Sequence, residues 1–207
     1  MACLLLLLAL VAVFLLDRSV DLWVASHHSA AWETGARICS RFFAWHWLML
    51  GAGAGLLFAP RARRRDWMRL LCVMMVAASL AGLSADVLRG ITGRTRPSAR
   101  VTQGWYGVRS DGRWLVFNHA YNSFPSGHTS AAMGFAFPLF LWRRRLGLVA
   151  LPFLAVVAGA RVYVGAHHVS DVLAGAALGT LIALWVWRRS SAGERLVNAV
   201  RSWRVPA

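Results

Sequence analysis

The chain has 207 residues, of which 58% are hydrophobic, and its mean hydropathy of +0.52 is too high for an ordinary soluble domain. All 23 basic residues are arginine, and with the 8 acidic residues they give a formal net charge of +15. Most of these arginines border apolar stretches, which argues against a nucleic-acid-binding surface. The sequence predicts one all-α domain, residues 1–207, that is an integral membrane protein.

Six apolar stretches predict transmembrane helices, because a helix needs about 20 residues to cross a bilayer. The first lacks the positive flank and the small-residue cleavage site of a signal peptide, so we expect a retained helix. The first and the fourth are short. In chain order the stretches are Ala2–Leu16, Ile38–Ala59, Trp67–Leu88, Thr129–Trp142, Leu146–Val164 and Asp171–Trp187.

Small residues recur in two of these stretches, as "GAGAG" at residues 51–55 and as Gly175 and Gly179, four residues apart. Small residues let membrane helices approach closely. We therefore interpret both patterns as helix packing and not as a cofactor loop.

Arginine placement predicts the topology, because cytoplasmic connections carry the excess of basic residues. The basic connections are the second-to-third, the fourth-to-fifth and the C-terminal tail. Both termini are therefore expected in the cytoplasm, and the connections at 17–37, 89–128 and 165–170 face outward. The inner arginines are Arg61, Arg63, Arg64, Arg65, Arg69, Arg143, Arg144, Arg145, Arg188, Arg189, Arg195, Arg201 and Arg204.

The long outward connection departs from this rule, because it is also rich in arginine. Its arginines indicate that an anionic group binds on this side. They are Arg89, Arg94, Arg96, Arg100, Arg109 and Arg113.

Three polar clusters fall on the outward side although they are far apart in the chain. The first is "RGITGRTRP" from Arg89 to Pro97, the second is "PSGH" from Pro125 to His128, and the third is "RVYVGAHHVSD" from Arg161 to Asp171. Because all three lie at the same membrane face, we expect them to form one site.

In order and spacing, these clusters resemble the three signature motifs of the type 2 phosphatidic acid phosphatase family, whose site is similar to that of vanadium haloperoxidases. The chain departs from the family pattern at Arg89, where the family has Lys, and at Ala160, where it usually has Ser. Arginine still binds phosphate oxygens, in a forked geometry. The missing hydroxyl removes at most one hydrogen bond, worth about 0.5–1.5 kcal/mol.

Phosphoryl transfer needs a nucleophile, a proton for the leaving group and positive charge around the phosphate oxygens. His167 is the candidate nucleophile, and Asp171 can hold its imidazole if both lie on the first turn of a helix. His128 is the candidate general acid. Positive charge and an anion-binding backbone are expected from Arg89, Arg96, Arg161, Ser126 and Gly127.

The predicted function is an enzyme, a lipid phosphatase that forms a phosphohistidine intermediate. Two alternatives stay open: a lipid phosphotransferase that uses the same intermediate, and a non-catalytic lipid-binding or transport protein. The resemblance implies substrates such as undecaprenyl diphosphate, phosphatidylglycerophosphate, phosphatidate or the lipid A 1-phosphate.

No cofactor or metal is expected, because the histidines and carboxylates lack familiar ligand spacing. Partners are the lipid substrate and membrane lipids, with no nucleic acid. Richness in arginine and alanine is typical of a bacterial, GC-rich coding source, so we expect a multi-pass protein of the bacterial inner membrane. His168 is interpreted as structural, and Asp86 either orients Arg89 or forms a plain helical ion pair with it.

Overall fold

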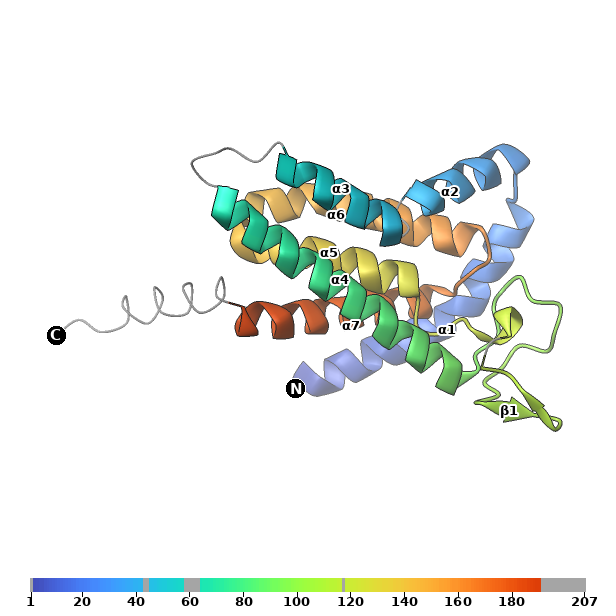
Figure 1. Cartoon of the computed structure of the whole chain (residues 1–207). Coiled ribbons are helices and arrows are strands. Elements are labelled where there is room, and N and C mark those ends of the chain that lie inside the picture. Colours follow the sequence, from blue (N-terminus) through green and yellow to red (C-terminus); the bar gives the residue numbers. More distant parts are fainter. Residues whose placement is uncertain (1, 43–44, 58–63, 117, 191–207) are drawn as a thin grey trace.

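The computed structural model describes residues 2–42, 45–57, 64–116 and 118–190, and the chain is mostly helical (Figure 1). One small hairpin, β1–β2, lies in the connection between α4 and α5 and is the exception to the expected all-α fold within these residues. In chain order the elements are α1 (Ala2–Ser26), α2 (Ala30–Phe42), α3 (Trp45–Leu57), α4 (Arg64–Thr92), β1 (Arg109–Ser110), β2 (Arg113–Trp114), the 3₁₀ helix η2 (His119–Tyr121), α5 (Gly127–Trp142), α6 (Arg144–Tyr163) and α7 (Val169–Arg189).

Helices α4 to α7 form the central bundle and alternate in direction. The ends of α4 and α6 and the beginnings of α5 and α7 meet where the connection 93–126 lies, and we call this the loop end (Figure 1). The described inner arginines lie at or near the opposite ends of these helices, and the loop end is also rich in arginine. Arg61, Arg63, Arg195, Arg201 and Arg204 lie outside the described residues.

Three of the described helices, α4, α6 and α7, are long and apolar enough to cross a membrane. Their outward faces carry large apolar side chains in contact with the surroundings, such as Leu83 on α4, Phe153 on α6 and Leu181 on α7. These helices match the third, fifth and sixth predicted spans. The total of six spans, and the membrane side that the loop end faces, stay predictions.

The first predicted span is too short. Helix α1 does not end at Leu16 but continues to Ser26, and the expected outward connection 17–37 is helical except at residues 27–29. The prediction ended the span before Asp17 because hydropathy treats every charged side chain as solvated. In the structure Asp17 is 4% exposed and pairs with Arg94, and a charge that is paired within the protein does not end the helix.

The second predicted span, Ile38–Ala59, divides into two elements. Its first residues belong to α2, which ends at Phe42, and most of the rest forms α3 from Trp45 to Leu57. Residues 43–44 between them are outside the described part of the chain. Helix α2 begins at Ala30, and before the predicted span it contains Glu33, Thr34 and Arg37, which hydropathy excluded.

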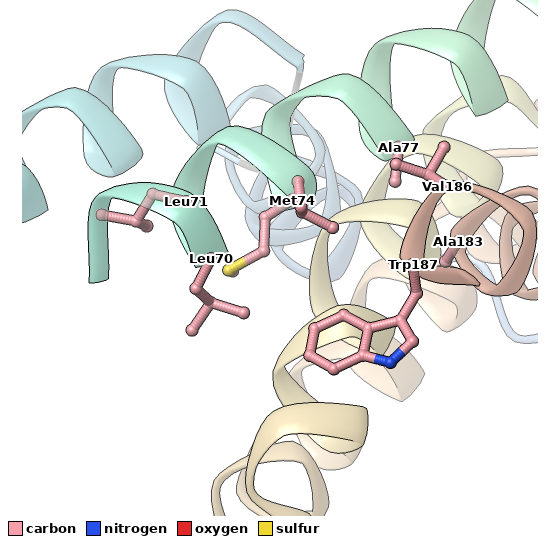
Figure 2. Packing of buried hydrophobic residues seen from close by; sticks show 8 residues of the cluster. Leu70, Leu71, Met74, Ala77, Ala183, Val186 and Trp187 are labelled. Atoms are coloured by element: carbon pink, nitrogen blue, oxygen red, sulfur yellow. The ribbon is translucent and has the colours of Figure 1, made fainter. Parts of the chain in front are cut away.

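The hydrophobic core joins α4 to α7 at the end of the bundle far from the loop end. Figure 2 shows Leu70, Met74 and Ala77 of α4 packed beside Ala183 and Trp187 of α7. This apolar cluster lies at the same end of the bundle as the described inner arginines. The polar clusters lie at the other end, the loop end.

Close helix contacts in the bundle depend on glycine. A Cβ atom on Gly175 would lie 2.6 Å from the Ser126 carbonyl oxygen, and one on Gly179 would lie 2.4 Å from the Ser130 carbonyl oxygen. The packing interpretation is therefore confirmed for this pair, which brings α7 against α5. In "GAGAG" the packing is limited to one residue: a Cβ on Gly55 would lie 3.8 Å from Leu71 Cδ1 of α4, whereas one on Gly51 or Gly53 would meet nothing within 4 Å in the described structure.

Candidate active site

The three polar clusters come together at the loop end, as expected. Arg89 lies in the last turn of α4 and Arg161 in the last turn of α6, and Gly127 begins α5. Backbone hydrogen bonds join the segments: Ser126 N donates to Asp171 O at 2.9 Å, and Ser98 N donates to Gly165 O at 3.0 Å.

The connection after α4 is closed at its base by two glycines. Gly93 has φ +59°, and a Cβ there would lie 2.0 Å from the carbonyl oxygen of Gly107. Gly107 N donates to Thr92 O and Tyr106 N donates to Gly93 O, both at 3.1 Å. This crossing fixes the path of the chain between Arg89 and Arg96.

His167 is fully buried and has one defined tautomer. Its Nδ1 lies 2.7 Å from the carbonyl oxygen of Ser123, and because a carbonyl only accepts, Nδ1 carries the hydrogen. Nε2 of His167 is buried and has no hydrogen-bond partner among the described residues. The imidazole thus keeps an unshared electron pair on Nε2, which is what a nucleophile requires.

Arginine charges surround this histidine. The Nε atoms of Arg96 and Arg161 are buried without a partner in the described part of the chain, and Arg96 Nη2 donates to Asn122 O at 3.2 Å. Burial, with Arg161 and Arg89 nearby, lowers the pKa of Arg96 to about 10. Burial, followed by the charges of Arg161 and Arg96, holds the pKa of His167 well below 6.5. Uncompensated positive charge of this kind favours an anion.

Arg89 and His128 line a neighbouring pocket of about 330 Å³, together with Asp86 and Gly127. The Arg89 guanidinium pairs with the Asp86 carboxylate, and a Cβ on Gly127 would lie 3.1 Å from Arg89 Nη2. This ion pair fits both interpretations of Asp86 and does not choose between them. The glycine lets the guanidinium rest against the start of α5.

Asp171 does not hold His167 directly, which corrects the expected arrangement. Helix α7 begins at Val169, so His167 precedes it, and the distance from His167 Nδ1 to Asp171 Oδ2 is 3.8 Å. Other donors occupy the carboxylate: Oδ2 accepts from His168 N at 2.8 Å and from Ser123 Oγ at 2.5 Å. Asp171 thus holds Ser123 and His168, which lie next to His167.

Ser126 is fully buried at the start of α5. Its hydroxyl oxygen accepts from Thr129 Oγ1 at 3.1 Å, and it makes no side-chain cap to the helix. Ser126 therefore contributes to the contact of α5 with α7, and its part in anion binding, like that of Gly127, stays a prediction.

Arg94 was grouped with the arginines expected to bind an anion, and this was wrong. Its Nη2 pairs with Asp17 at 2.7 Å and its Nη1 with Asp171 at 2.5 Å. Both carboxylates are buried, so its charge is balanced within the protein. The missed signal was Asp17 itself, because a lone carboxylate in an apolar helix requires a partner.

His168 is structural, in agreement with its interpretation. Its Nδ1 lies 2.7 Å from Asp21 Oδ2 and its Nε2 lies 3.1 Å from Thr95 O. Burial lowers the pKa of His168, but the hydrogen bond to Asp21 and the charges of Asp171 and Asp21 together outweigh it, so the pKa is raised overall. With an acceptor at each nitrogen, the charged imidazolium satisfies both.

The described residues contain no group of three or more His, Cys, Asp or Glu side chains that could hold a metal ion. Independence of metals stays a prediction for the assay described below.

Comparisons with known proteins agree with the motif resemblance. The family model described as "PAP2 superfamily" matches residues 66–194. The bacitracin transport permease protein BcrC of Bacillus licheniformis is 31% identical over 115 residues, 56% of this chain and 55% of the relative. The lipid A 1-phosphatase of Rhizobium johnstonii is 34% identical over 140 residues, 64% of this chain and 54% of the relative. The matched segments thus span about half the length of these relatives.

The fold is similar to the crystal structure of a transmembrane PAP2-type phosphatidylglycerolphosphate phosphatase from Bacillus subtilis. The two share 22% sequence identity with a TM-score of 0.54, over 84% of each chain. At this identity the likeness concerns the fold.

Proposed function

Because this chain belongs to the PAP2 superfamily, we propose that it is a membrane phosphatase that hydrolyses a lipid phosphate or diphosphate through a phosphohistidine. The observation that carries the proposal is that Nε2 of buried His167 and the nearby Nε atoms of Arg96 and Arg161 all lack a hydrogen-bond partner among the described residues. A phosphate group satisfies all three, because its oxygens accept from the guanidinium groups while phosphorus accepts the electron pair of Nε2.

In the first step Nε2 of His167 attacks phosphorus, forming the P–N bond as the bond from phosphorus to the lipid oxygen breaks. His128 donates a proton to that oxygen, and the alcohol or lipid monophosphate leaves. Arg89, Arg96 and Arg161 neutralise the three equatorial oxygens of the transferring group. The Ser123 carbonyl accepts the Nδ1 hydrogen throughout, which stabilises positive charge on the phosphorylated ring.

In the second step water attacks the phosphohistidine. His128, now neutral, accepts a proton from that water, the P–N bond breaks, and inorganic phosphate is released while His167 regains its electron pair. His128 is thus returned to its acid form for the next cycle, so that no metal or cofactor enters the balance.

The proposed substrates share a phosphate or diphosphate headgroup on a lipid: undecaprenyl diphosphate, phosphatidylglycerophosphate, phosphatidate and the lipid A 1-phosphate. The name of one relative, a lipid A 1-phosphatase, supports this class. A site at an outward-facing loop end, with both termini in the cytoplasm, would act on headgroups in the outer leaflet of the bacterial inner membrane.

A substrate panel in detergent tests the proposal. Purified protein is incubated with each of the four lipids in excess chelator, and released phosphate is measured. We expect release from at least one lipid without an added acceptor, together with acid-labile, base-stable label on the protein from a phosphate-labelled lipid. Transfer that depends on an acceptor lipid would instead indicate a phosphotransferase. Release from none of the lipids, with or without added zinc or magnesium, would favour a lipid-binding or transport protein.

A further inference from the structure

A buried ring of hydrogen bonds joins α1 to the start of α7. Asp17 of α1 accepts from Arg94 Nη2 at 2.7 Å and from Ser170 Oγ at 2.5 Å through Oδ2, and from Ser170 N at 2.9 Å through Oδ1. Arg94 Nη1 closes the ring by donating to Ser170 Oγ at 2.6 Å. Asp17, Arg94 and Ser170 are 4%, 7% and 3% exposed, so water does not compete for these bonds.

The ring continues to the reactive imidazole. Arg94 Nη1 also donates to Asp171, which accepts from the Ser123 hydroxyl and from the backbone N–H of His168. Ser123 supplies the carbonyl that holds His167 Nδ1, and His168 is the next residue after His167. The Ser123 carbonyl and the backbone at His168 both orient the imidazole. Their positions depend on where Asp171 lies, and the position of Asp171 depends on Arg94.

Aromatic rings cover the guanidinium that joins the two carboxylates. The central carbon of Arg94 lies 4.8 Å from the ring centroid of Trp105, 5.2 Å from that of Phe14 and 6.0 Å from that of Phe124. The rings lie around the guanidinium, and its two ends pair with Asp17 and Asp171. Loss of Asp17 would leave one end without its carboxylate and let Arg94 turn.

We propose that Asp17 is a positioning residue for the reaction at His167, acting through Arg94 and Asp171. It lies outside the segment that matches the family model, which begins at residue 66. The inference rests on the proposed function, because it assumes that His167 attacks phosphorus. It assigns α1 a part in the chemistry as well as in the fold.

Kinetics of Asp17→Asn separate positioning from a purely structural effect. We expect kcat to fall about 10- to 100-fold, because a misplacement of about 1 Å at a reacting group costs up to about 100-fold. Inhibition by orthovanadate should weaken by a similar factor, since its trigonal-bipyramidal form needs Nε2 in place. Inhibition by inorganic phosphate should change by less than about twofold, because Arg89, Arg96 and Arg161 bind it and lie outside the ring.

Arg18→Gln is the matched control, because Arg18 is the next residue of α1 and its side chain is exposed. It should keep the wild-type kcat and both inhibition constants. If Asp17→Asn lowers kcat but leaves vanadate inhibition at the wild-type value, fewer molecules are folded and the positioning role is wrong. Wild-type values for kcat and both inhibitors would also overturn it.

Ser170→Ala covers the case in which Asp17→Asn does not fold. It removes the hydroxyl that bridges Asp17 and Arg94 but keeps both carboxylates and the guanidinium. We expect the same pattern, with weaker vanadate inhibition and unchanged phosphate inhibition, and wild-type behaviour would overturn the inference. A wild-type protein that releases phosphate from no lipid overturns the proposed function, and the inference with it.

Discussion

The side chains of His167 and Asp171 share no hydrogen bond, although the residues are four apart and His167 Nδ1 lies 3.8 Å from Asp171 Oδ2. Ser123 links them through two different groups. Its carbonyl oxygen accepts from His167 Nδ1 at 2.7 Å, and its hydroxyl donates to Asp171 Oδ2 at 2.5 Å. The tautomer of the imidazole is thus fixed by a backbone atom, which no side-chain substitution removes.

Substitutions at Asp171 and Ser123 should therefore differ in severity. Asp171→Asn replaces an acceptor for three donors by an amide with one oxygen, so we expect a loss of kcat of about 100-fold or more. It also breaks the buried pair with Arg94, so the variant should unfold at a lower temperature. Ser123→Ala keeps the carbonyl and should lose less than about 10-fold in kcat. Equal losses would show that the hydroxyl, and not the carbonyl, controls the imidazole.

The two catalytic histidines should differ in where phosphate is trapped. His167→Ala should abolish both hydrolysis and labelled phosphoenzyme, because it removes the nucleophile. His128→Ala should lose about 10²–10⁴-fold with a lipid substrate, and less with p-nitrophenyl phosphate, whose leaving group needs little protonation. Label retained on His167→Ala and absent from His128→Ala would mean that the two roles are reversed.

The pH profile should reflect the environment of His167. Its pKa lies well below 6.5 because of burial, Arg161 and Arg96, and the protonated ring cannot attack. The acid limb of kcat/KM should therefore lie below pH 6.5, and activity should persist as the pH falls through that value. Arg161→Gln removes a positive neighbour and should move the limb to higher pH, whereas Arg109→Gln, on the exposed hairpin, should not. If the acid limb of kcat/KM does not move in Arg161→Gln, the limb reports the ionisation of another group, such as the substrate.

Position 89 should accept lysine. Arg89 reaches the pocket from the last turn of α4 and pairs with Asp86, and an ammonium group can neutralise the same phosphate oxygens. Arg89→Lys should keep kcat/KM within about 10-fold of wild type, whereas Arg89→Gln, without charge, should lose about 10- to 100-fold, as expected for one charge-assisted hydrogen bond of about 1.5–3 kcal/mol. Equal losses in both would show that the forked geometry is required.

The sequence predicted the helices whose apolar runs are uninterrupted, and it predicted the gathering of the three motifs at one end. It failed where a charge is buried. Asp17 made α1 look short, and Arg94 looked like a ligand for an anion, because hydropathy and the topology rule both treat a charge as solvated. Only the pairing of the two, across 77 residues of chain, shows otherwise.

The internal geometry of the site was less accessible. The spacing of His167 and Asp171 suggested a direct contact along a helix, but α7 begins two residues after His167. Ser123 lies outside the three motifs. It holds His167 through its backbone carbonyl oxygen, a group that every residue has. A backbone contact of this kind depends on the path of the loop and cannot be inferred from side-chain types.

Packing at Gly179 should control stability. A Cβ there would lie 2.4 Å from the Ser130 carbonyl oxygen, so Gly179→Ala must push α7 from α5 and should cost about 1–3 kcal/mol. Gly53→Ala on α3 is the control, because a Cβ there would meet nothing within 4 Å in the described structure. Thermal unfolding in detergent should show a lower midpoint for the first variant alone. Equal midpoints for Gly179→Ala and wild type would mean that the two helices separate without cost.

The crossing of Gly93 and Gly107 divides the long connection into a clamped base and a free tip. Leu115 N donates to Val108 O at 2.9 Å, so the chain returns to the base immediately after the hairpin, whose turn at Asp111 and Gly112 is exposed. A fluorophore or an affinity tag inserted at this turn would report on the loop end without altering the path from Arg89 to Arg96. The same site would reveal by accessibility to a membrane-impermeant reagent which side of the bilayer the loop end occupies in living cells.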